Sequence, residues 1–400
     1  MSTPGRRLRI LYYAWTVPEP RGGACLAMYR HFIEHDDFEL AVVSSAVFTH
    51  PTIPSLRIVR HPLLVRLSNT RFSRLFRQWE MLLEPCFIPS GVISFARAFR
   101  PDAVFTIPDN TLSWSACKLA TRLHLPLITN FQDWWPRGQF TYQLERPYGI
   151  TRSILEYRFR EMYRRSALAF CTSDGMREML GPHANAPTLY PCPAIAQPLN
   201  NGGIRAPIPG GTLRVVYAGT VINAYGRQLL RLARAIPQGS AIKLEIYGPH
   251  PDWSVEDLHE MTTRGIYCGC VSPAEIQHKL KAADICLVVM SFEQSLALMM
   301  RTSFTSKFLE YTQHGKPVVI WGPEYCQPVK VAQREQAAEV ITVDEPAAVV
   351  ACLQQLGDAT RWMDSARRSR NAAEGLFSHH RIHGCLVESI TQLLTVKETA

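Results

Sequence analysis

The sequence predicts an α/β protein built from two doubly wound domains of nearly equal size. Short apolar runs alternate with helical patterns along all 400 residues, which is typical of this class. Runs such as Ile285–Met290 (ICLVVM) are apolar at every position, as expected of strands covered on both faces of a parallel sheet. A stretch rich in proline and glycine, residues 191–211, interrupts the alternation in the middle of the chain.

Apolar runs of strand length recur in both halves of the chain. In the first half they predict strands at 8–14, 38–44, 103–107, 125–129 and 167–172. In the second half they predict strands at 213–218, 242–247, 284–290, 317–321 and 339–343.

Helical spacing appears between these runs. Cys25, Met28 and Phe32 lie on one face of a helix that follows the first strand. Residues 229–236 show the same periodicity after the strand at 213–218. Ser272-Pro273-Ala274-Glu275 is a capping box with proline at the first helical position, and it predicts a helix over 273–282.

These elements divide into an N-terminal domain at 1–195, a linker at 196–211 and a C-terminal domain at 212–374. A last helix within 375–400 is expected to return to the N-terminal domain. Two such domains leave a cleft lined by the carboxyl ends of their strands, where ligands bind in open α/β sheets.

Composition excludes several classes of protein. The mean hydropathy of −0.06 and the lack of an apolar run near twenty residues exclude a membrane-spanning helix. The apolar run in the N-terminal MSTPGRRLRILYYAW is too short for a signal peptide. The eleven cysteines show no repeated spacing, which indicates free thiols in a reducing cytosol.

The net charge of +9 is concentrated in the first half of the chain. Residues 1–200 hold 23 Lys and Arg against 15 Asp and Glu, which favours an anionic partner such as lipid or a phosphorylated substrate. No module of alternating aromatic and basic residues accompanies this charge, so no nucleic-acid partner is expected.

The stretch Phe304–Pro323 (FTSKFLEYTQHGKPVVIWGP) carries the most specific chemistry. Ser303 or Thr305 is expected to cap a short helix, and Gly315 to end it. Lys307 then sits in the first turn, where the helix dipole disfavours a cation unless an anion binds there. From local physics alone, a solvated i, i+3 pair of Lys307 with Glu310 is an equal alternative.

The same stretch resembles the nucleotide-sugar site of retaining glycosyltransferases with the GT-B fold, the "glycosyl transferases group 1" family. The shared pattern is Ser-Lys, a hydrophobic pair, Glu-Tyr, and then Gly-Lys-Pro-Val. The resemblance implies that Glu310 binds the ribose of the donor, and that Lys307, preceded by Ser306, binds its diphosphate.

Other segments extend this resemblance over most of the chain. LRVVYAGTVINAYGRQ is similar to the first strand and glycine turn of the family's C-terminal domain, which implies that Gly219 and Thr220 lie near the donor phosphates. GIYCGCVSPAEIQ resembles the loop that approaches the base, here Cys268–Val271. The family's lysine in the next helix is replaced by Tyr225, and Arg227 is the nearest substitute.

The N-terminal domain shares two elements with the family. PEPRGGACLAMYRHF resembles its glycine-rich loop, which implies that Gly22 and Gly23 lie beside the donor phosphate or the acceptor. TNFQDWWP resembles an Asp-hydrophobic-Trp-Pro element of members that build surface polysaccharides, which implies that Asp133 is catalytic. Thr302 stands where many relatives carry a first glutamate, eight positions before Glu310.

The resemblance implies a retaining hexosyltransferase that moves a sugar from a nucleoside-diphosphate donor to a saccharide or a lipid-linked acceptor. Lys307 and backbone N–H groups would stabilise the charge of the departing diphosphate, so neither a metal nor another cofactor is expected. A GT-B epimerase of sugar nucleotides and a non-catalytic partner subunit are the alternatives. The expected location is the cytoplasm, at the inner face of the plasma membrane.

Two further segments have two interpretations each. Residues 61–85 form a basic amphipathic helix with Phe72 and Trp79 on its apolar face, which indicates either an anionic membrane surface or the core face of a domain helix. SHHRIHGC, residues 378–385, places three histidines and a cysteine close together, either as zinc ligands or as surface residues of the last helix.

Overall fold

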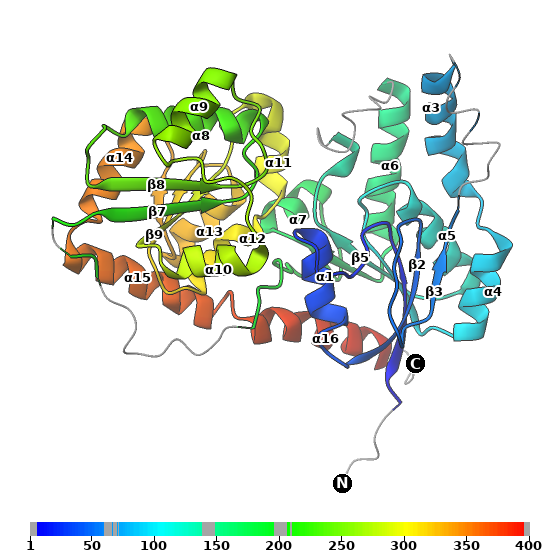
Figure 1. Ribbon diagram of the computed structural model, residues 1–400. Coiled ribbons are helices and arrows are strands. Elements are labelled where there is room, and N and C mark those ends of the chain that lie inside the picture. The colour runs from blue at the N-terminus through cyan, green and yellow to red at the C-terminus, as the bar shows by residue number, and fades with distance from the viewer. Residues whose placement is uncertain are drawn as a thin grey trace, which may run out of the picture. The chain divides into compact units, whose positions relative to one another are not determined.

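The computed structural model of the protein describes residues 6–59, 66, 70, 72–137, 149–195, 206–208 and 210–395. The chain divides into two compact units (Figure 1). The N-terminal unit comprises Met1–Cys192 and Ile382–Ala400, and the C-terminal unit comprises Pro193–Arg381. Most of the linker predicted at 196–211 lies outside the described residues.

The N-terminal unit contains a sheet of six parallel strands in the order β3-β2-β1-β4-β5-β6. The strands are β1 (Leu8–Tyr13), β2 (Phe38–Ser44), β3 (Ser55–Arg57), β4 (Ala103–Thr106), β5 (Leu127–Phe131) and β6 (Leu168–Cys171). Strand order reverses at β1, which lies between β2 and β4. In open α/β sheets, ligands bind outside the carboxyl ends of the strands at such a reversal.

The described helices of this unit are α1 (Ala24–Phe32), α3 (Ser73–Leu83), η1 (Glu84–Cys86), α4 (Ser90–Phe99), α5 (Leu112–Leu123), η2 (Trp135–Arg137), α6 (Gly149–Arg165) and α7 (Asp174–Leu180). The last helix, α16 (His379–Thr395), begins in the C-terminal unit and lies mostly in the N-terminal one. It packs beside α1, where His383 of α16 stacks on His31 of α1 with ring centroids 5.6 Å apart.

The C-terminal unit contains a sheet of five parallel strands in the order β11-β10-β9-β7-β8. The strands are β7 (Leu213–Ala218), β8 (Ile242–Tyr247), β9 (Ile285–Val289), β10 (Val318–Trp321) and β11 (Glu339–Ile341). The strand order reverses at β7, so the carboxyl ends of β7 and β9 form the corresponding ligand edge of this unit.

Helices cover both faces of this sheet. They are α8 (Asn223–Ala235), α9 (Val255–Thr263), α10 (Pro273–Lys281), η3 (Gln294–Leu296), α11 (Ala297–Thr302), α12 (Ser306–Thr312), α13 (Gln327–Glu335), α14 (Pro346–Gln355) and α15 (Ala359–Glu374). Helices α8 and α14 pack together over one face, and α12 packs against α15 over the other (Figure 1).

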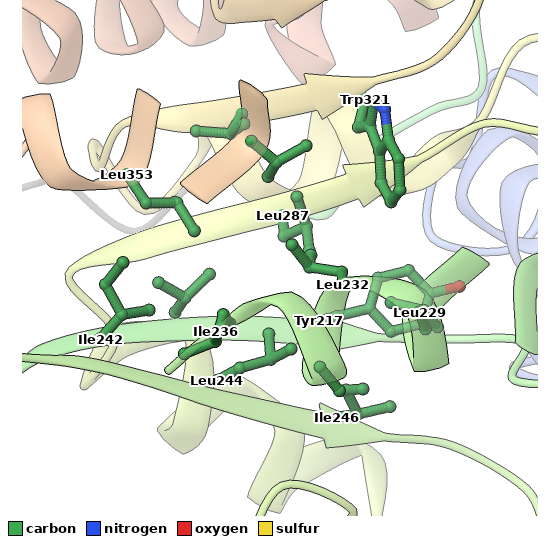
Figure 2. Close-up of a cluster of buried hydrophobic side chains, with 14 of the residues drawn as sticks. Tyr217, Leu229, Leu232, Ile236, Ile242, Leu244, Ile246, Leu287, Trp321 and Leu353 are labelled. Atoms are coloured by element: carbon green, nitrogen blue, oxygen red, sulfur yellow. The ribbon is translucent and has the colours of Figure 1, made fainter. Parts of the chain in front are cut away.

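A continuous hydrophobic core fixes the position of the strand ends in the C-terminal unit. Leu229 and Leu232 of α8 and Leu353 of α14 pack on strand residues such as Leu287 and Trp321 (Figure 2). Each fully buried aliphatic side chain contributes about 1.5–3 kcal/mol relative to an exposed one. This packing holds the carboxyl ends of β7, β9 and β10 in place relative to one another.

The predicted α/β doubly wound class is confirmed, and all ten predicted strands are present. The predicted helix at 273–282 is confirmed as α10, in which Ser272 and Glu275 form both bonds of the capping box. One strand was missed: β3 has three residues that lie at the sheet edge and carry no apolar run. Strand β5 begins two residues later than the prediction of 125–129.

The prediction that no helix is able to span a membrane needs correction. Among the described residues, the helical stretch Leu75–Phe99 is long and apolar enough by length and composition, and 22% of an apolar 18-residue window within it is buried. Such a stretch is weak evidence for a span. Proline lies within it at Pro85 and Pro89, and it is divided into α3, η1 and α4.

Candidate functional site

Lys307 lies against Gly219 at the carboxyl end of β7. A Cβ atom added at Gly219 would be 1.9 Å from Lys307 Cε and 2.7 Å from Nζ. The position therefore accepts only glycine while the lysine side chain keeps its path along the backbone. Thr305 caps α12 as predicted, and its Oγ1 accepts from the Lys307 N–H at 3.4 Å.

Tyr311 fixes α12 to the end of β7. Its hydroxyl donates to the Ala218 carbonyl and accepts from the Ala218 N–H, both at 2.9 Å. The neighbouring Tyr217 donates its hydroxyl to the Thr220 carbonyl at 2.7 Å. These bonds hold Gly219 and Thr220 beside Lys307. The sequence analysis assigned no role to Tyr311, although it follows Glu310 directly in the quoted motif.

The Lys307 ammonium has an unfavourable environment. Burial lowers its pKa, and burial is the sole cause of the shift, so no carboxylate among the described residues offsets it. Its Nζ lies 5.9 Å from the ring centroid of Tyr217. An anion bound nearby would favour the charged form of the Lys307 side chain.

Glu310 lies three residues after Lys307, on the same face of α12, and is partly buried. Ser306 is the first residue of the same helix. The helix has only seven residues, so its dipole alone is a weak basis for an anion site. An anion at this position would instead meet the lysine side chain and the backbone at Gly219.

The loops after β7 and β8 meet at this edge. The Gly219 N–H donates to the Tyr247 carbonyl oxygen at 2.8 Å, and the Gly248 N–H donates to the Gly269 carbonyl oxygen at 3.0 Å. A Cβ at Gly248 would lie 2.1 Å from the Gly219 carbonyl oxygen. The predicted base loop Cys268–Val271 thus adjoins the turn that holds Gly219.

Arg227 has a carboxylate partner in this structure. It forms an ion pair with Glu293, which lies in the loop after β9, and both side chains are largely exposed. Glu293 was not singled out by the sequence analysis, because the family pattern places its first glutamate at position 302. Thr302 is fully buried and donates its hydroxyl to the Leu298 carbonyl at 2.9 Å. Thr302 therefore supplies no carboxylate here, and Glu293 is a carboxylate that the sequence analysis did not consider.

In the N-terminal unit, a second group of polar residues lies at the carboxyl ends of β1, β4 and β5. Asp109 follows β4, and its Oδ2 accepts from the Thr16 backbone N–H at 3.1 Å and from the Thr16 hydroxyl. Burial, with a smaller effect from Asp133, raises the pKa of Asp109 to about 6. Among the described residues, no donor lies within hydrogen-bonding distance of Asp109 Oδ1.

Asp133 and the glycine pair occupy the same sheet edge. Asp133 follows β5 and is exposed, and its carbonyl accepts from the Trp135 N–H at 2.9 Å. Gly23 precedes α1 with φ of 69°, a conformation that glycine adopts without strain. A Cβ added at Gly22 or Gly23 would meet no atom within 4 Å. Asp109 and Thr16 were missed because neither belongs to a recognisable motif.

Asp109 should make stability depend on pH. A raised carboxyl pKa favours folding fully below about pH 4, and this contribution is lost as pH rises through about 6. Between pH 4.5 and 7, the wild type should therefore lose about 2–3 kcal/mol relative to Asp109→Asn, since one pKa unit equals about 1.4 kcal/mol. Urea unfolding across this range measures the difference.

The exposed Glu324 supplies a matched control for this experiment. Glu324→Gln removes a surface carboxylate, and the difference between its free energy of unfolding and that of the wild type should stay constant from pH 4.5 to 7. If the difference in the free energy of unfolding between the wild type and Asp109→Asn stayed constant from pH 4.5 to 7, the raised pKa of Asp109 would be contradicted.

Two doubly wound units, each with a polar ligand edge at its strand reversal, define a GT-B architecture, and the chain has the GT-B fold. Solved structures match it over nearly its full length. One is HepE from Anabaena in complex with UDP, with a TM-score of 0.63, 14% identity, and 96% of this chain and 100% of that chain covered. Another is sucrose-phosphate synthase from Thermosynechococcus elongatus, with a TM-score of 0.65, 14% identity, and 98% and 100% covered.

A glycosyltransferase from Rickettsia africae is similar to the same extent, with a TM-score of 0.64 and 11% identity. The match covers 98% of this chain and 99% of that chain. A putative UDP-N-acetylglucosamine 2-epimerase from Listeria monocytogenes matches with a TM-score of 0.50, 12% identity, and 96% and 95% covered. No protein-family model and no curated protein sequence matches the chain. At these identities the likeness establishes the fold.

Proposed function

We propose that this protein is a glycosyltransferase whose donor is a sugar nucleotide bound in the C-terminal unit. The observation that carries the proposal is the Lys307 ammonium, held against Gly219 at the strand reversal without a carboxylate partner among the described residues. The diphosphate of a sugar nucleotide is an anion that this ammonium would bind.

The chemistry follows from this placement. As the bond between sugar and phosphate breaks, negative charge grows on the departing diphosphate. Lys307, Ser306 and the backbone at Gly219 and Thr220 are positioned to bind this charge before the reaction begins, which stabilises the transition state. Glu310 would accept hydrogen bonds from the ribose hydroxyls. In this scheme Arg227, paired with Glu293, serves the sugar end of the donor.

The N-terminal unit would supply the acceptor side. Asp133 is proposed as the catalytic carboxylate and Gly22 and Gly23 as the loop beside the acceptor, with Asp109 as a further acid or base at the same edge. We propose a retaining hexosyl transfer in which the departing phosphate helps to deprotonate the acceptor, so that neither a metal nor another cofactor is required. The acceptor would be a saccharide or a lipid-linked saccharide in polysaccharide or glycoconjugate synthesis.

Known structures with this fold support the proposal. HepE was crystallised with UDP and with UDP-glucose. WaaG, a glycosyltransferase involved in lipopolysaccharide biosynthesis, matches with a TM-score of 0.57. The epimerase from Listeria supports the alternative of a sugar-nucleotide epimerase, at a lower TM-score.

The test is a thermal-shift panel of UDP, GDP and ADP with their sugar derivatives. Ligand at 100 times its dissociation constant stabilises a protein by about 2.7 kcal/mol, which is a shift of several degrees. One nucleoside diphosphate is expected to produce such a shift, and the matching sugar nucleotide to be consumed when acceptor is added. No shift with any diphosphate would contradict the donor site.

Product analysis separates the alternatives. Release of the nucleoside diphosphate with the sugar attached to the acceptor supports transfer. An epimerised sugar without an acceptor product would identify an epimerase, and binding without any turnover would identify a non-catalytic subunit.

We further propose that α3 contacts an anionic membrane surface at the inner face of the plasma membrane. Phe72, Leu75 and Trp79 are 60%, 59% and 64% exposed on one side of this helix, so its apolar face is not covered by the domain core. The excess of basic residues in the first half of the chain supports an anionic surface. The first part of the predicted segment 61–85 lies outside the described residues.

Vesicle co-sedimentation tests this proposal. The wild type should bind vesicles containing phosphatidylserine at least about tenfold better than neutral ones, and binding should weaken as salt rises. Trp79→Ser should reduce binding, whereas Val255→Ser, which removes an even more exposed apolar side chain from the C-terminal unit, should not. Equal sedimentation with neutral and anionic vesicles would exclude the electrostatic contribution.

A further inference from the structure

Three side chains with metal-binding atoms converge where α16 packs on the N-terminal unit. His35 and Asp37 lie in the loop between α1 and β2, and His383 lies on α16. His383 Nε2 is 2.9 Å from Asp37 Oδ2. The rings of His35 and His383 are stacked with centroids 3.8 Å apart. One ligand atom from each residue lies within 4.8 Å of the other two.

The set has the dimensions and donor types of a transition-metal site. A tetrahedral zinc ion with bonds of about 2.0–2.1 Å holds its ligand atoms roughly 3.3 Å apart, so movements of about an ångström would close this set around an ion. Two imidazoles and one carboxylate leave a fourth position for water. His383 is buried, His35 is partly buried and Asp37 is exposed, so the ion has a path from solvent.

A fourth residue is placed to orient the central ligand. His31 Nδ1 lies 3.3 Å from His383 Nδ1, so one of these two nitrogens carries the hydrogen. If His383 Nε2 faces an ion, its Nδ1–H donates to His31. Metal-ligating histidines almost always donate their second ring N–H to an acceptor, which fixes the tautomer and the ring orientation.

The charges of these three side chains suit a divalent cation. A metal ion binds the neutral form of an imidazole, and the Asp37 carboxylate partly neutralises the charge of the ion.

We propose that His35, Asp37 and His383 form a structural site for a divalent transition metal, with zinc as the best match to two imidazoles and a carboxylate. The ion would fasten α16 to the loop between α1 and β2, two segments separated by 346 positions in the sequence. It has no part in the sugar chemistry proposed above.

This site differs from the cluster that the sequence suggested on the last helix. His379 Nδ1 lies 2.9 Å from the carbonyl oxygen of Pro193, and His380 is exposed. Only His383 of that cluster joins the proposed ligands. The other two come from the α1–β2 loop, which no spacing rule connects to α16.

The test is a zinc titration of the metal-free full-length protein in competition with a chromophoric chelator. The wild type is expected to bind one tight equivalent. His35→Gln and Asp37→Asn should each raise the dissociation constant at least about tenfold, the effect seen for altered metal ligands and their partners. His380→Gln, an exposed histidine on the same helix, should bind as the wild type does.

Two further measurements make the result decisive. Zinc should raise the thermal midpoint of the wild type and of His380→Gln but not that of the two ligand variants, whose midpoints without metal show that they fold. Cobalt should give a spectrum without a thiolate charge-transfer band. Equal zinc affinity in the wild type and His35→Gln, or a cobalt–thiolate band that assigns the ion to cysteines such as Cys268 and Cys270, would overturn the proposal.

Discussion

Replacing Lys307 by alanine is expected to weaken the binding of the nucleoside diphosphate about 100-fold or more, which corresponds to roughly 3 kcal/mol. The ammonium lies partly buried beside Gly219, and its pKa is lowered by burial without a carboxylate to offset it. Removing it takes away the cation that meets the phosphates but costs the fold little, because no ion pair is lost. Calorimetric titration with the preferred diphosphate, together with urea unfolding, measures both effects.

Lys281 provides the control for this variant. It is exposed at the end of α10, so Lys281→Ala removes the same charge from the same unit away from the strand reversal. Its diphosphate affinity should stay within twofold of the wild type. If Lys307→Ala binds the diphosphate as tightly as the wild type does, the donor site is wrongly placed.

Gly219→Ala should weaken diphosphate binding nearly as much, because it displaces the Lys307 side chain instead of removing it. The added Cβ would lie 1.9 Å from Lys307 Cε, so the flexible end of the lysine must swing away from the end of β7. The ammonium then leaves the phosphate position although its charge remains. We expect a loss in diphosphate affinity of about 30- to 100-fold, with turnover reduced in parallel.

A double-mutant cycle identifies the cause. If both changes act through the ammonium, Lys307→Ala/Gly219→Ala should bind the diphosphate no more weakly than Lys307→Ala alone. Gly91→Ala is the control, because a Cβ added there meets no atom within 4 Å. Fully additive losses would mean that Gly219 acts independently of Lys307.

The sequence predicted those features that depend on neighbouring residues. The capping box of Ser272 and Glu275, the cap at Thr305 and the apolar strands are all determined within a few positions, and all were found. Lys307 and Glu310 were identified because they share one short motif.

The contacts that were missed join residues far apart in the sequence. Tyr311 meets Ala218, and Asp109 meets Thr16, each across 93 positions. Neither contact leaves a periodic or compositional signal, because each depends on how strands are ordered in the sheet. Strand β3 was missed for another reason. None of its three residues is buried, and the strand lies at the edge of the sheet, so it has no apolar run.

The division of α16 between the units bears on the order in which the chain becomes structured during synthesis. Leu386 and Ile390 are fully buried, yet they follow the whole of Pro193–Arg381, which forms the other unit. At about 5–20 residues per second, a ribosome needs roughly ten to forty seconds to make that intervening segment. Throughout this interval the nascent N-terminal unit lacks α16, so the surface that receives this helix is exposed to chaperones and to neighbouring chains until α16 has been made.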